Sequence, residues 1–155
     1  MISAHTIGLA RYADAPAIAG MSRDLIEHGL GWKWTPARIH RCLGDPAINV
    51  AVAREGGALA GFAIMQYKDD EAHLLLFAVR PASRRKGVGS ALLAWLEQTA
   101  LTAGVGLVYL EARTQNTGAR MFYGRHGYNE IARVRGMYRG REDGVRLAKD
   151  LWWRG

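Results

Sequence analysis

Cysteine and long apolar runs are scarce in this chain, and each scarcity excludes a class of protein. Cys42 is the single cysteine among 155 residues, so no internal disulfide can form and no zinc-ligand spacing exists. Such a chain suits a reducing compartment, and we expect it in the cytoplasm. No apolar run reaches the roughly 18–20 residues that cross a bilayer, so we expect no membrane partner. Residues 1–10 lack the basic start and apolar centre of a signal peptide.

Motifs for metal binding are also missing. The five histidines show no metal-ligand spacing, and the HExxH helix motif does not occur. We therefore expect no metal.

What is present is typical of a small folded domain. The apolar fraction is 49% and the charged fraction 23%, close to the usage of ordinary globular proteins. The length fits one hydrophobic core, and no repeat or linker divides the chain. We expect residues 1–155 to form a single domain.

Positive charge is concentrated in the C-terminal half. Residues 1–79 hold seven Lys or Arg and eight Asp or Glu, a net charge of −1, whereas residues 80–155 hold fourteen and six, a net charge of +8. Such asymmetry is typical of a site for a polyanion, either nucleic acid or a phosphorylated ligand. Scattered arginines would give only a solvated basic face. The compact run Arg84-Arg85-Lys86, beside two glycines, points to a ligand.

The N-terminal half predicts a strand, two helices and a hairpin. Asp14 stands at the N-cap position of the first helix, with Pro16 in its first turn. The turn Glu55-Gly56-Gly57 joins two apolar runs and is typical of a hairpin. The expected elements are a strand at 3–11, helices from Asp14 to about His28 and from Thr35 to Gly44, and strands at 48–54 and 58–67.

The C-terminal half alternates strands and helices. Residues 72–79 are almost continuously apolar, as in a strand covered on both faces, and Pro81 ends them. Apolar residues at helical spacing follow from Val88. The expected elements are strands at 72–79, 105–112, 128–138 and 145–152, helices at 88–104 and 119–126, and a turn at 140–144. This order predicts an α/β or α+β sheet with helices on its faces.

The segment from Val79 to Leu93 has the most informative pattern. A buried strand enters a loop that contains Arg84-Arg85-Lys86, Gly87 and Gly89, and the loop opens an amphipathic helix. Glycine lets the backbone approach a ligand closely, and the free N–H groups of a first helical turn attract anions. A tight turn that needs glycine only for its shape is the alternative. Two glycines with three cations favour a diphosphate ligand.

Two familiar phosphate loops do not fit this segment. A Walker loop needs Gly-Lys-Ser or Gly-Lys-Thr after its glycines, and none is present. A dinucleotide fingerprint needs a third glycine where Leu92 stands. Glu111 lies at about the distance of a ribose-binding acid, so the dinucleotide interpretation is weakened but stays open.

Two spaced motifs cover the stretch from residue 79 to residue 128. The spacing Val79-x-Pro81-x-x-Arg84-x-x-Gly87-x-Gly89-x-x-Leu92-Leu93 resembles the acetyl-CoA pyrophosphate loop of the GNAT superfamily of N-acetyltransferases. The spacing Leu110-Glu111-Ala112-Arg113-x-x-Asn116-x-x-Ala119-x-x-x-Tyr123-x-x-x-Gly127-Tyr128 resembles that superfamily's second signature. The order and separation of the two motifs are more specific than either motif alone.

Within the superfamily, the chain is most similar to the bacterial ribosomal-protein alanine N-acetyltransferases of the RimI type. Trp34-Thr35, Asp70-Glu71-Ala72 and the late run from Gly140 to Asp143 carry this similarity. Two positions depart from the pattern: Ser83 stands where an aromatic residue is common, and Met137-Tyr138 stands where that branch has paired tyrosines.

The resemblance implies a fold, a cosubstrate and a binding site. The implied GNAT fold has a mixed sheet of about seven strands, splayed between strands 4 and 5 and flanked by about four helices. Acetyl-CoA is the implied donor, and an amine attacks its thioester directly. The residues implied to contact CoA are Phe77, Ala78 and Val79 at the pantetheine arm, Arg84, Arg85, Lys86, Gly87, Val88, Gly89 and Ser90 at the pyrophosphate, and Asn116 and Tyr123.

Glu111 and Tyr123 are the candidate catalytic residues. Glu111 sits near the end of the apolar strand at 105–112, on the same face as Leu107 and Tyr109, where we expect desolvation to raise its pKa towards that of a useful base. Its alternative role is that of an ordinary strand-end carboxylate or of a salt-bridge partner of Arg113. Tyr123 is the implied acid for the CoA sulfur, and its alternative role is aromatic packing.

Other classes of function remain open at this point. A non-catalytic basic module that binds nucleic acid is the main alternative, although basic and aromatic residues do not interleave as such modules require. A GNAT fold that only senses CoA is the second. The acceptor amine could be a protein N-terminus, a lysine, a polyamine, an amino acid or an aminoglycoside. Trp152 and Trp153 could finish the last strand or form a homodimer contact.

Overall fold

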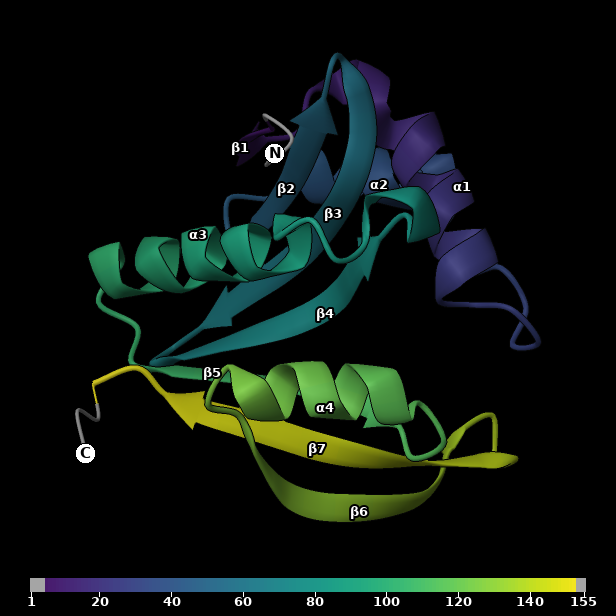
Figure 1. Cartoon of the computed structure of the whole chain (residues 1–155), viewed down its shortest axis with the longest axis vertical. Coiled ribbons are helices and arrows are strands. Elements are labelled where there is room, and N and C mark those ends of the chain that lie inside the picture. The colour runs from purple at the N-terminus through teal and green to yellow at the C-terminus, as the bar shows by residue number, and fades with distance from the viewer. Residues whose placement is uncertain (1–4, 153–155) are drawn as a thin grey trace.

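The computed structural model describes residues 5–152, and its centre is one seven-stranded sheet (Figure 1). The strands are β1 (Thr6–Leu9), β2 (Ile48–Glu55), β3 (Ala58–Lys68), β4 (Glu71–Val79), β5 (Leu107–Arg113), β6 (Asn129–Tyr138) and β7 (Glu142–Asp150). The helices are α1 (Ala15–Leu25), α2 (Pro36–Leu43), α3 (Val88–Thr102) and α4 (Thr117–Arg125), with short 3-10 turns η1 (Tyr12–Asp14) and η2 (Pro81–Ser83). None of the helices within residues 5–152 is long and apolar enough to cross a membrane.

The strands lie in the order β1-β2-β3-β4-β5-β7-β6, and the mixed sheet with four helices confirms the predicted fold class. Neighbouring strands are antiparallel except for β4 and β5, which run parallel because α3 carries the chain back between them. The predicted order of elements is confirmed, and the differences lie at their ends.

The first helix ends earlier than predicted, at Leu25 instead of His28. The carboxylate of Glu27 explains this end, because it accepts hydrogen bonds from the Ser22 hydroxyl and from the backbone N–H groups of Lys33 and Trp34. These bonds stabilise a loop in place of another helical turn.

Asp14 stands at the N-cap position of α1, but its side chain does not cap the helix, so that part of the prediction was wrong. Its carboxylate instead accepts from the backbone N–H of Arg11 at 2.7 Å and pairs with Arg54 of β2. The pair ties the start of α1 to the sheet.

The last strand also differs from its prediction. It spans Glu142–Asp150 instead of residues 145–152, because the turn after β6 is shorter than the five residues proposed for it. Trp152 lies beyond the strand and is 63% exposed. Trp153 and residues 3 and 4 of the predicted first strand lie outside the described residues, and a homodimer contact through the C-terminus stays a prediction.

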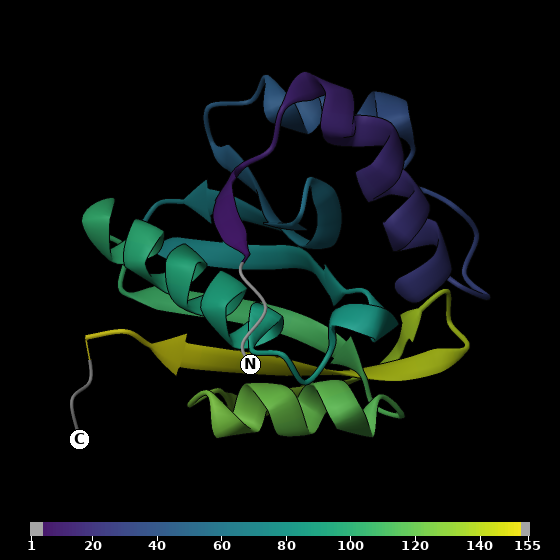
Figure 2. The same ribbon diagram turned by 45° about the horizontal axis from the view of Figure 1, so that its top comes forward.

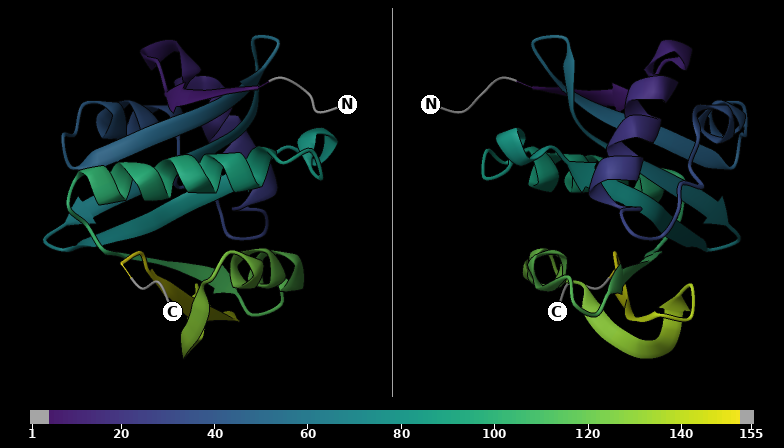
Figure 3. Two further views of the ribbon diagram at one scale, coloured as in Figure 1. Left: turned by 60° about the vertical axis from the view of Figure 1, so that its left-hand side comes forward. Right: turned by 90° about the vertical axis from the view of Figure 1, so that its right-hand side faces the viewer.

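The two faces of the sheet are covered by different helices (Figures 2 and 3). Helices α3 and α4 cover one face, where Leu92, Leu96 and Tyr123 pack against Leu110 and Leu147 of the sheet. Helices α1 and α2 cover the N-terminal part of the other face. We call these the helix-3/4 face and the helix-1/2 face.

The sheet splays open between its two parallel strands. Pairing between β4 and β5 runs from Glu71 opposite Leu107 to Leu74 opposite Leu110 and then stops. At the same point β4 carries one extra residue, Leu75, relative to β3. A bulge of this kind bends a strand and redirects its side chains. The last residues of β4 therefore lack a neighbour on the β5 side, and the two strands diverge visibly (Figure 1).

The packing of α3 gives a direct test of this core. Leu96 is completely buried between α3 and the sheet, so Leu96→Ala should lower the free energy of unfolding by roughly 2–5 kcal/mol. Urea denaturation measures the loss. Met121→Ala is the control, because Met121 is 61% exposed and should change stability by less than about 0.5 kcal/mol. Equal midpoints for both variants would contradict the assigned packing.

Candidate active site

The loop between β4 and α3 presents three cations and a helix start. Arg84, Arg85 and Lys86 are exposed, and no ion pair joins them to an acid among residues 5–152. Gly87 occupies the N-cap of α3 with φ of 80°, a value that favours glycine, and no side chain caps the helix there. The cations and the uncapped N–H groups can therefore serve an anionic ligand.

Gly89 has a packing role that the sequence did not reveal. A Cβ at this position would lie 3.3 Å from the Phe122 ring and 3.6 Å from Val79. The glycine therefore lets α4 pack closely on the first turn of α3. Phe122, together with Phe77 and Tyr123, forms an aromatic cluster beneath the loop.

Ser90 is hydrogen-bonded within the protein. Its hydroxyl lies 2.9 Å from Nε2 of His126, whose Nδ1 lies 2.8 Å from the carbonyl oxygen of Phe122. A carbonyl only accepts, so Nδ1 carries the proton, and in this tautomer of the neutral ring Nε2 accepts from the Ser90 hydroxyl. Phosphate oxygens only accept, so the predicted contact of Ser90 with a phosphate would require the hydroxyl to donate its proton to the phosphate instead of to His126.

Asn116 caps α4, since its side-chain oxygen accepts from the N–H of Ala119 at 3.1 Å. This bond fixes the loop before the helix, and a contact with pantetheine stays a prediction.

Tyr123 lies on the helix-3/4 face and is 7% exposed. Its ring meets Phe77 and Tyr128 edge-on, with centroids 6.0 and 5.7 Å apart. Burial, reinforced by the nearby Tyr138, raises the pKa of Tyr123 far above its ordinary value. The phenol therefore keeps its proton at neutral pH and can act as a donor.

Glu111 lies on the opposite side of the sheet from Tyr123. Val108, Leu110 and Ala112 pack into the helix-3/4 core, so the alternate residue Glu111 lies on the helix-1/2 face. The candidate acid and base thus flank the splay from its two faces.

The side chains of His73 and Arg146 hydrogen-bond to the Glu111 carboxylate. Nε2 of His73 lies 2.6 Å from Oε1, and Nε of Arg146 donates to Oε2 at 2.8 Å. Burial works to raise the pKa of Glu111, but the hydrogen bonds from His73 and Arg146 outweigh burial, and its pKa lies below the usual value. The expectation of a raised pKa was therefore wrong. The proposed alternative partner, Arg113, binds Glu142 instead.

Tyr138 links the two candidates electrostatically. Burial first, and then the charge of Glu111, raise the pKa of Tyr138 to about 12. Tyr138 also acts on the pKa of Tyr123, so it lies near both groups. Gly144 makes room for this arrangement, because a Cβ there would collide with Met137 and press on the Tyr138 ring.

Arg113 joins two loops beside the splay. Its guanidinium donates to the carbonyls of Ile26 and His28 at 2.7 and 3.1 Å, and to the Glu142 carboxylate at 3.0 Å. The loop after α1 and the turn between β6 and β7 therefore meet at the open end of β5 (Figure 2).

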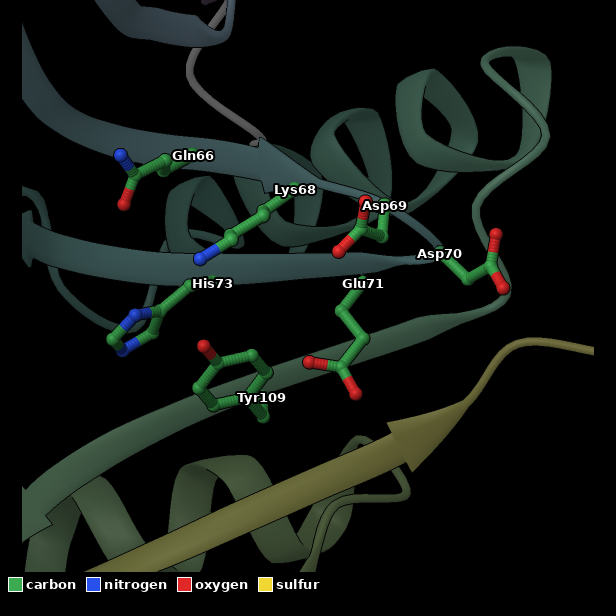
Figure 4. Close-up of a pocket in the computed structure, with 7 residues that line it drawn as sticks. All are labelled: Gln66, Lys68, Asp69, Asp70, Glu71, His73 and Tyr109. Atoms are coloured by element: carbon green, nitrogen blue, oxygen red, sulfur yellow. The ribbon is translucent and has the colours of Figure 1, made fainter.

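A cavity of about 370 Å³ lies on the helix-1/2 face of the sheet (Figure 4). Side chains from β3, the turn after it, β4 and β5 line it: Gln66, Lys68, Asp69, Asp70, Glu71, His73 and Tyr109. His73 and Tyr109 are register partners in the parallel pair, and their rings stack at 4.2 Å.

Sequence reasoning missed His73, Arg146 and Tyr138 as members of this site. Alternation along β4 places His73 on the same face as Glu111. That signal is weak without the register of the parallel pair.

Comparisons with known proteins agree with the two sequence motifs. The family model described as "Acetyltransferase (GNAT) family" matches residues 20–128. The [ribosomal protein bS18]-alanine N-acetyltransferase of Escherichia coli K12 is 31% identical over 147 residues, covering 93% of this chain and 96% of that protein. The N-alpha-acetyltransferase RimI of Mycobacterium tuberculosis is 33% identical over 138 residues, covering 86% and 84%.

Solved structures give the same family. The crystal structure of the E. coli ribosomal-protein-S18-alanine N-acetyltransferase superposes with a TM-score of 0.84 at 30% identity, covering 98% of this chain and 97% of that one. Ard1 from Thermoplasma volcanium superposes with a TM-score of 0.83 at 27% identity, covering 97% and 99%. The chain therefore belongs to the acetyltransferase (GNAT) family and is an acetyl-CoA-dependent N-acetyltransferase.

Proposed function

We propose that this enzyme acetylates the α-amine of a polypeptide N-terminus that begins with alanine. The observation that carries the proposal is the placement of Glu111 and Tyr123 on the two faces of the splay, which separates an acceptor side from a donor side. The E. coli relative named for alanine acetylation of ribosomal protein bS18 supports the choice of acceptor. A ribosomal acceptor would place the reaction in the cytoplasm.

The donor occupies the splay in this proposal. The pyrophosphate of acetyl-CoA binds the loop from Arg84 to Gly89, mainly through backbone N–H groups and the exposed cations. The pantetheine arm runs along Phe77, Ala78 and Val79, where β4 has no partner strand towards β5. The Val79 N–H then polarises the thioester carbonyl.

The acceptor chain enters from the opposite face. The loop after α1 and the turn between β6 and β7, which Arg113 holds together, border that entrance. Glu111 projects to the same face, where its ionised carboxylate attracts an ammonium group. A flexible chain end fits an entrance bordered by loops.

The chemistry requires two proton movements. An α-ammonium must lose a proton before its nitrogen attacks the thioester carbon, and Glu111 is the proposed base, directly or through water. Attack forms the C–N bond, and collapse of the tetrahedral intermediate breaks the C–S bond. Tyr123 donates its proton to the departing sulfur, and a second proton from the acylated nitrogen restores the phenol through solvent. The sum releases acetylated amine, CoA and one proton.

An acceptor screen tests the proposal. Initial rates of thiol release are compared for an alanine-initiated peptide, the same peptide with a blocked N-terminus, and small polyamines and amino acids. We expect turnover on the free alanine peptide and none on its blocked form. Turnover on small amines alone would contradict the assigned acceptor and leave the acetyltransferase activity standing.

Acetyl-CoA should raise the melting temperature, because it binds only the native state. NAD should not raise it, because the loop lacks the third glycine of a dinucleotide fingerprint.

Lys86→Glu should weaken acetyl-CoA binding roughly tenfold, or about 1.4 kcal/mol, by placing a carboxylate at the phosphates. Arg41→Glu on α2 is the control for the change in net charge. Isothermal titration of both variants gives the affinities, and equal losses would contradict the assigned loop.

A further inference from the structure

We propose that His126 controls the direction of the Ser90 hydroxyl, so that binding of CoA at the start of α3 draws a proton onto His126. The inference rests on the proposed binding of the CoA pyrophosphate at the loop from Arg84 to Gly89, and it does not depend on the acceptor. It makes His126 a positioning residue for the donor and links the affinity for CoA to pH.

Ser90 lies where the proposed pyrophosphate binds. It is exposed and belongs to the first turn of α3. The N–H of Ala91 donates to the carbonyl oxygen of Gly87 at 3.0 Å, but within residues 5–152 the N–H groups of Val88, Gly89 and Ser90 donate no backbone hydrogen bond. These N–H groups and the Ser90 hydroxyl therefore form one set of donors for phosphate oxygens.

His126 is held in place on the other side of the Ser90 hydroxyl. It is the C-cap of α4, and its ring lies against the Phe122 ring with centroids 4.5 Å apart. The bond from Nδ1 to the Phe122 carbonyl oxygen, 2.8 Å long, keeps a proton on Nδ1. In the neutral ring Nε2 is therefore an acceptor, and it binds the Ser90 hydroxyl at 2.9 Å.

A bound diphosphate conflicts with this neutral arrangement. Phosphate oxygens only accept, so Ser90 must turn its proton away from His126 to donate to them. The lone pair of Nε2 would then face the lone pairs of the Ser90 oxygen. The other neutral tautomer moves the same conflict to the Phe122 carbonyl. The imidazolium resolves it, because both ring nitrogens donate while Ser90 donates to the phosphate.

The proton balance is simple, because no covalent bond of the ligand changes. Nε2 gains a proton from solvent, and the proton of Ser90 stays on its oxygen and turns towards the phosphate. Two features stabilise the added charge on His126. One is the C-terminal end of α4, where the helix dipole favours a cation, and the other is the negative diphosphate. Because protonation favours binding, binding must favour protonation to the same degree.

Other charged groups on the neighbouring elements enter any pH dependence. They are Arg125 on α4, Lys149 of β7 beside Gly127, Glu97 of α3, which binds Lys149 and the Tyr128 hydroxyl, and the loop cations Arg84, Arg85 and Lys86. Of these residue types, only histidine ordinarily changes charge between about pH 6 and 8. The 3′-phosphate of CoA titrates near roughly pH 6, so 3′-dephospho-CoA is used as a second ligand.

Isothermal titration in two buffers of different ionisation enthalpy counts the protons that accompany CoA binding. Between about pH 7 and 8, the wild-type protein should take up more than roughly half a proton per CoA, with 3′-dephospho-CoA as with CoA. Its affinity should fall several-fold, and at most about tenfold, for each unit rise in pH. His126→Gln should show no uptake and an affinity nearly independent of pH. His40→Gln is the control, because His40 stacks on Tyr12 and lies on α2, on the other face of the sheet.

Ser90→Ala tests whether the effect passes through the hydroxyl. This variant removes the group that must turn, so proton uptake should fall to less than about half of the wild-type value. Uptake that survives in Ser90→Ala, or that is equal in the wild type and His126→Gln, would overturn the inference. Thermal unfolding without ligand verifies that each variant is folded.

The outcomes separate this inference from the proposed donor site. Wild-type affinity in Lys86→Glu would overturn the assigned loop, whereas a working loop without proton uptake would overturn only the role of His126. Nitrogen-15 NMR of the wild-type protein gives a test that needs no variant. We expect the Nδ1–H tautomer of His126 in the free protein and protons on both nitrogens with CoA bound, and a neutral ring in the complex would overturn the inference.

Discussion

Tyr123→Phe should lower turnover roughly ten- to a few-hundred-fold at saturating acetyl-CoA, while the affinity for acetyl-CoA stays nearly unchanged. The phenol is buried with a strongly raised pKa, so it is a proton donor at neutral pH and not an anion. A donor to the departing sulfur acts mainly in the transition state. The substitution keeps the ring and its edge contacts with Phe77 and Tyr128, so packing should persist.

Tyr128→Phe is the matched control for this prediction. It removes a neighbouring buried phenol, which donates to Glu97 at 2.9 Å, from the same aromatic cluster. Its expected effect is on stability, about 1 kcal/mol from one hydrogen bond, with turnover preserved. Stopped-flow thiol detection measures both variants. Equal rates for the two phenylalanine variants would remove Tyr123 from the mechanism.

Glu111→Gln should reduce turnover roughly a hundred-fold or more near neutral pH, because it removes the charge that attracts and deprotonates the ammonium. The loss should become smaller at higher pH, where more of the amine is already neutral. Rates across the pH range test this, with Glu130→Gln as the control, since Glu130 forms an exposed ion pair with Arg120. A constant ratio of wild-type to variant rates at every pH would contradict deprotonation as the role of Glu111.

The same variant should change acid stability. The pKa of Glu111 is lowered in the folded protein, so its ionisation stabilises the native state above the ordinary glutamate pKa of roughly 4.3. That contribution is lost as the pH falls through the lower folded value. Glu111→Gln should therefore flatten the decline of unfolding free energy over this acid range. Urea titrations at several acid pH values measure it, and an unchanged slope would contradict the lowered pKa.

The spacing of apolar residues, and the glycines and prolines that end helices and strands, were sufficient to predict most of the fold. The apolar run at residues 72–79, ended by Pro81, gave β4 nearly to the residue. The cation and glycine pattern gave the loop before α3. Both features are formed by residues that are close together in the sequence, so the order and spacing of residue types are enough to predict them.

The surroundings of Glu111 could not be predicted in the same way. His73 reaches it only through the register of a parallel pair, and Arg146 through an antiparallel one. Burial does act to raise the pKa of Glu111, as expected for a strand residue with partly buried neighbours. The hydrogen bonds from His73 and Arg146, which come from distant segments of the chain, lower the pKa by more than burial raises it. The extra residue at Leu75 is likewise invisible in the sequence, although it turns Phe77 towards Tyr123.

The most direct test is to locate the transferred acetyl group. A peptide with a free N-terminal alanine and an internal lysine is incubated with acetyl-CoA and enzyme, and tandem mass spectrometry assigns the modified nitrogen. The account predicts one acetyl group on the alanine α-amine, formed by wild-type protein and strongly reduced with Tyr123→Phe. An acetyl group on the lysine side chain, or α-amine acetylation that both Tyr123→Phe and Glu111→Gln leave unchanged, would contradict it.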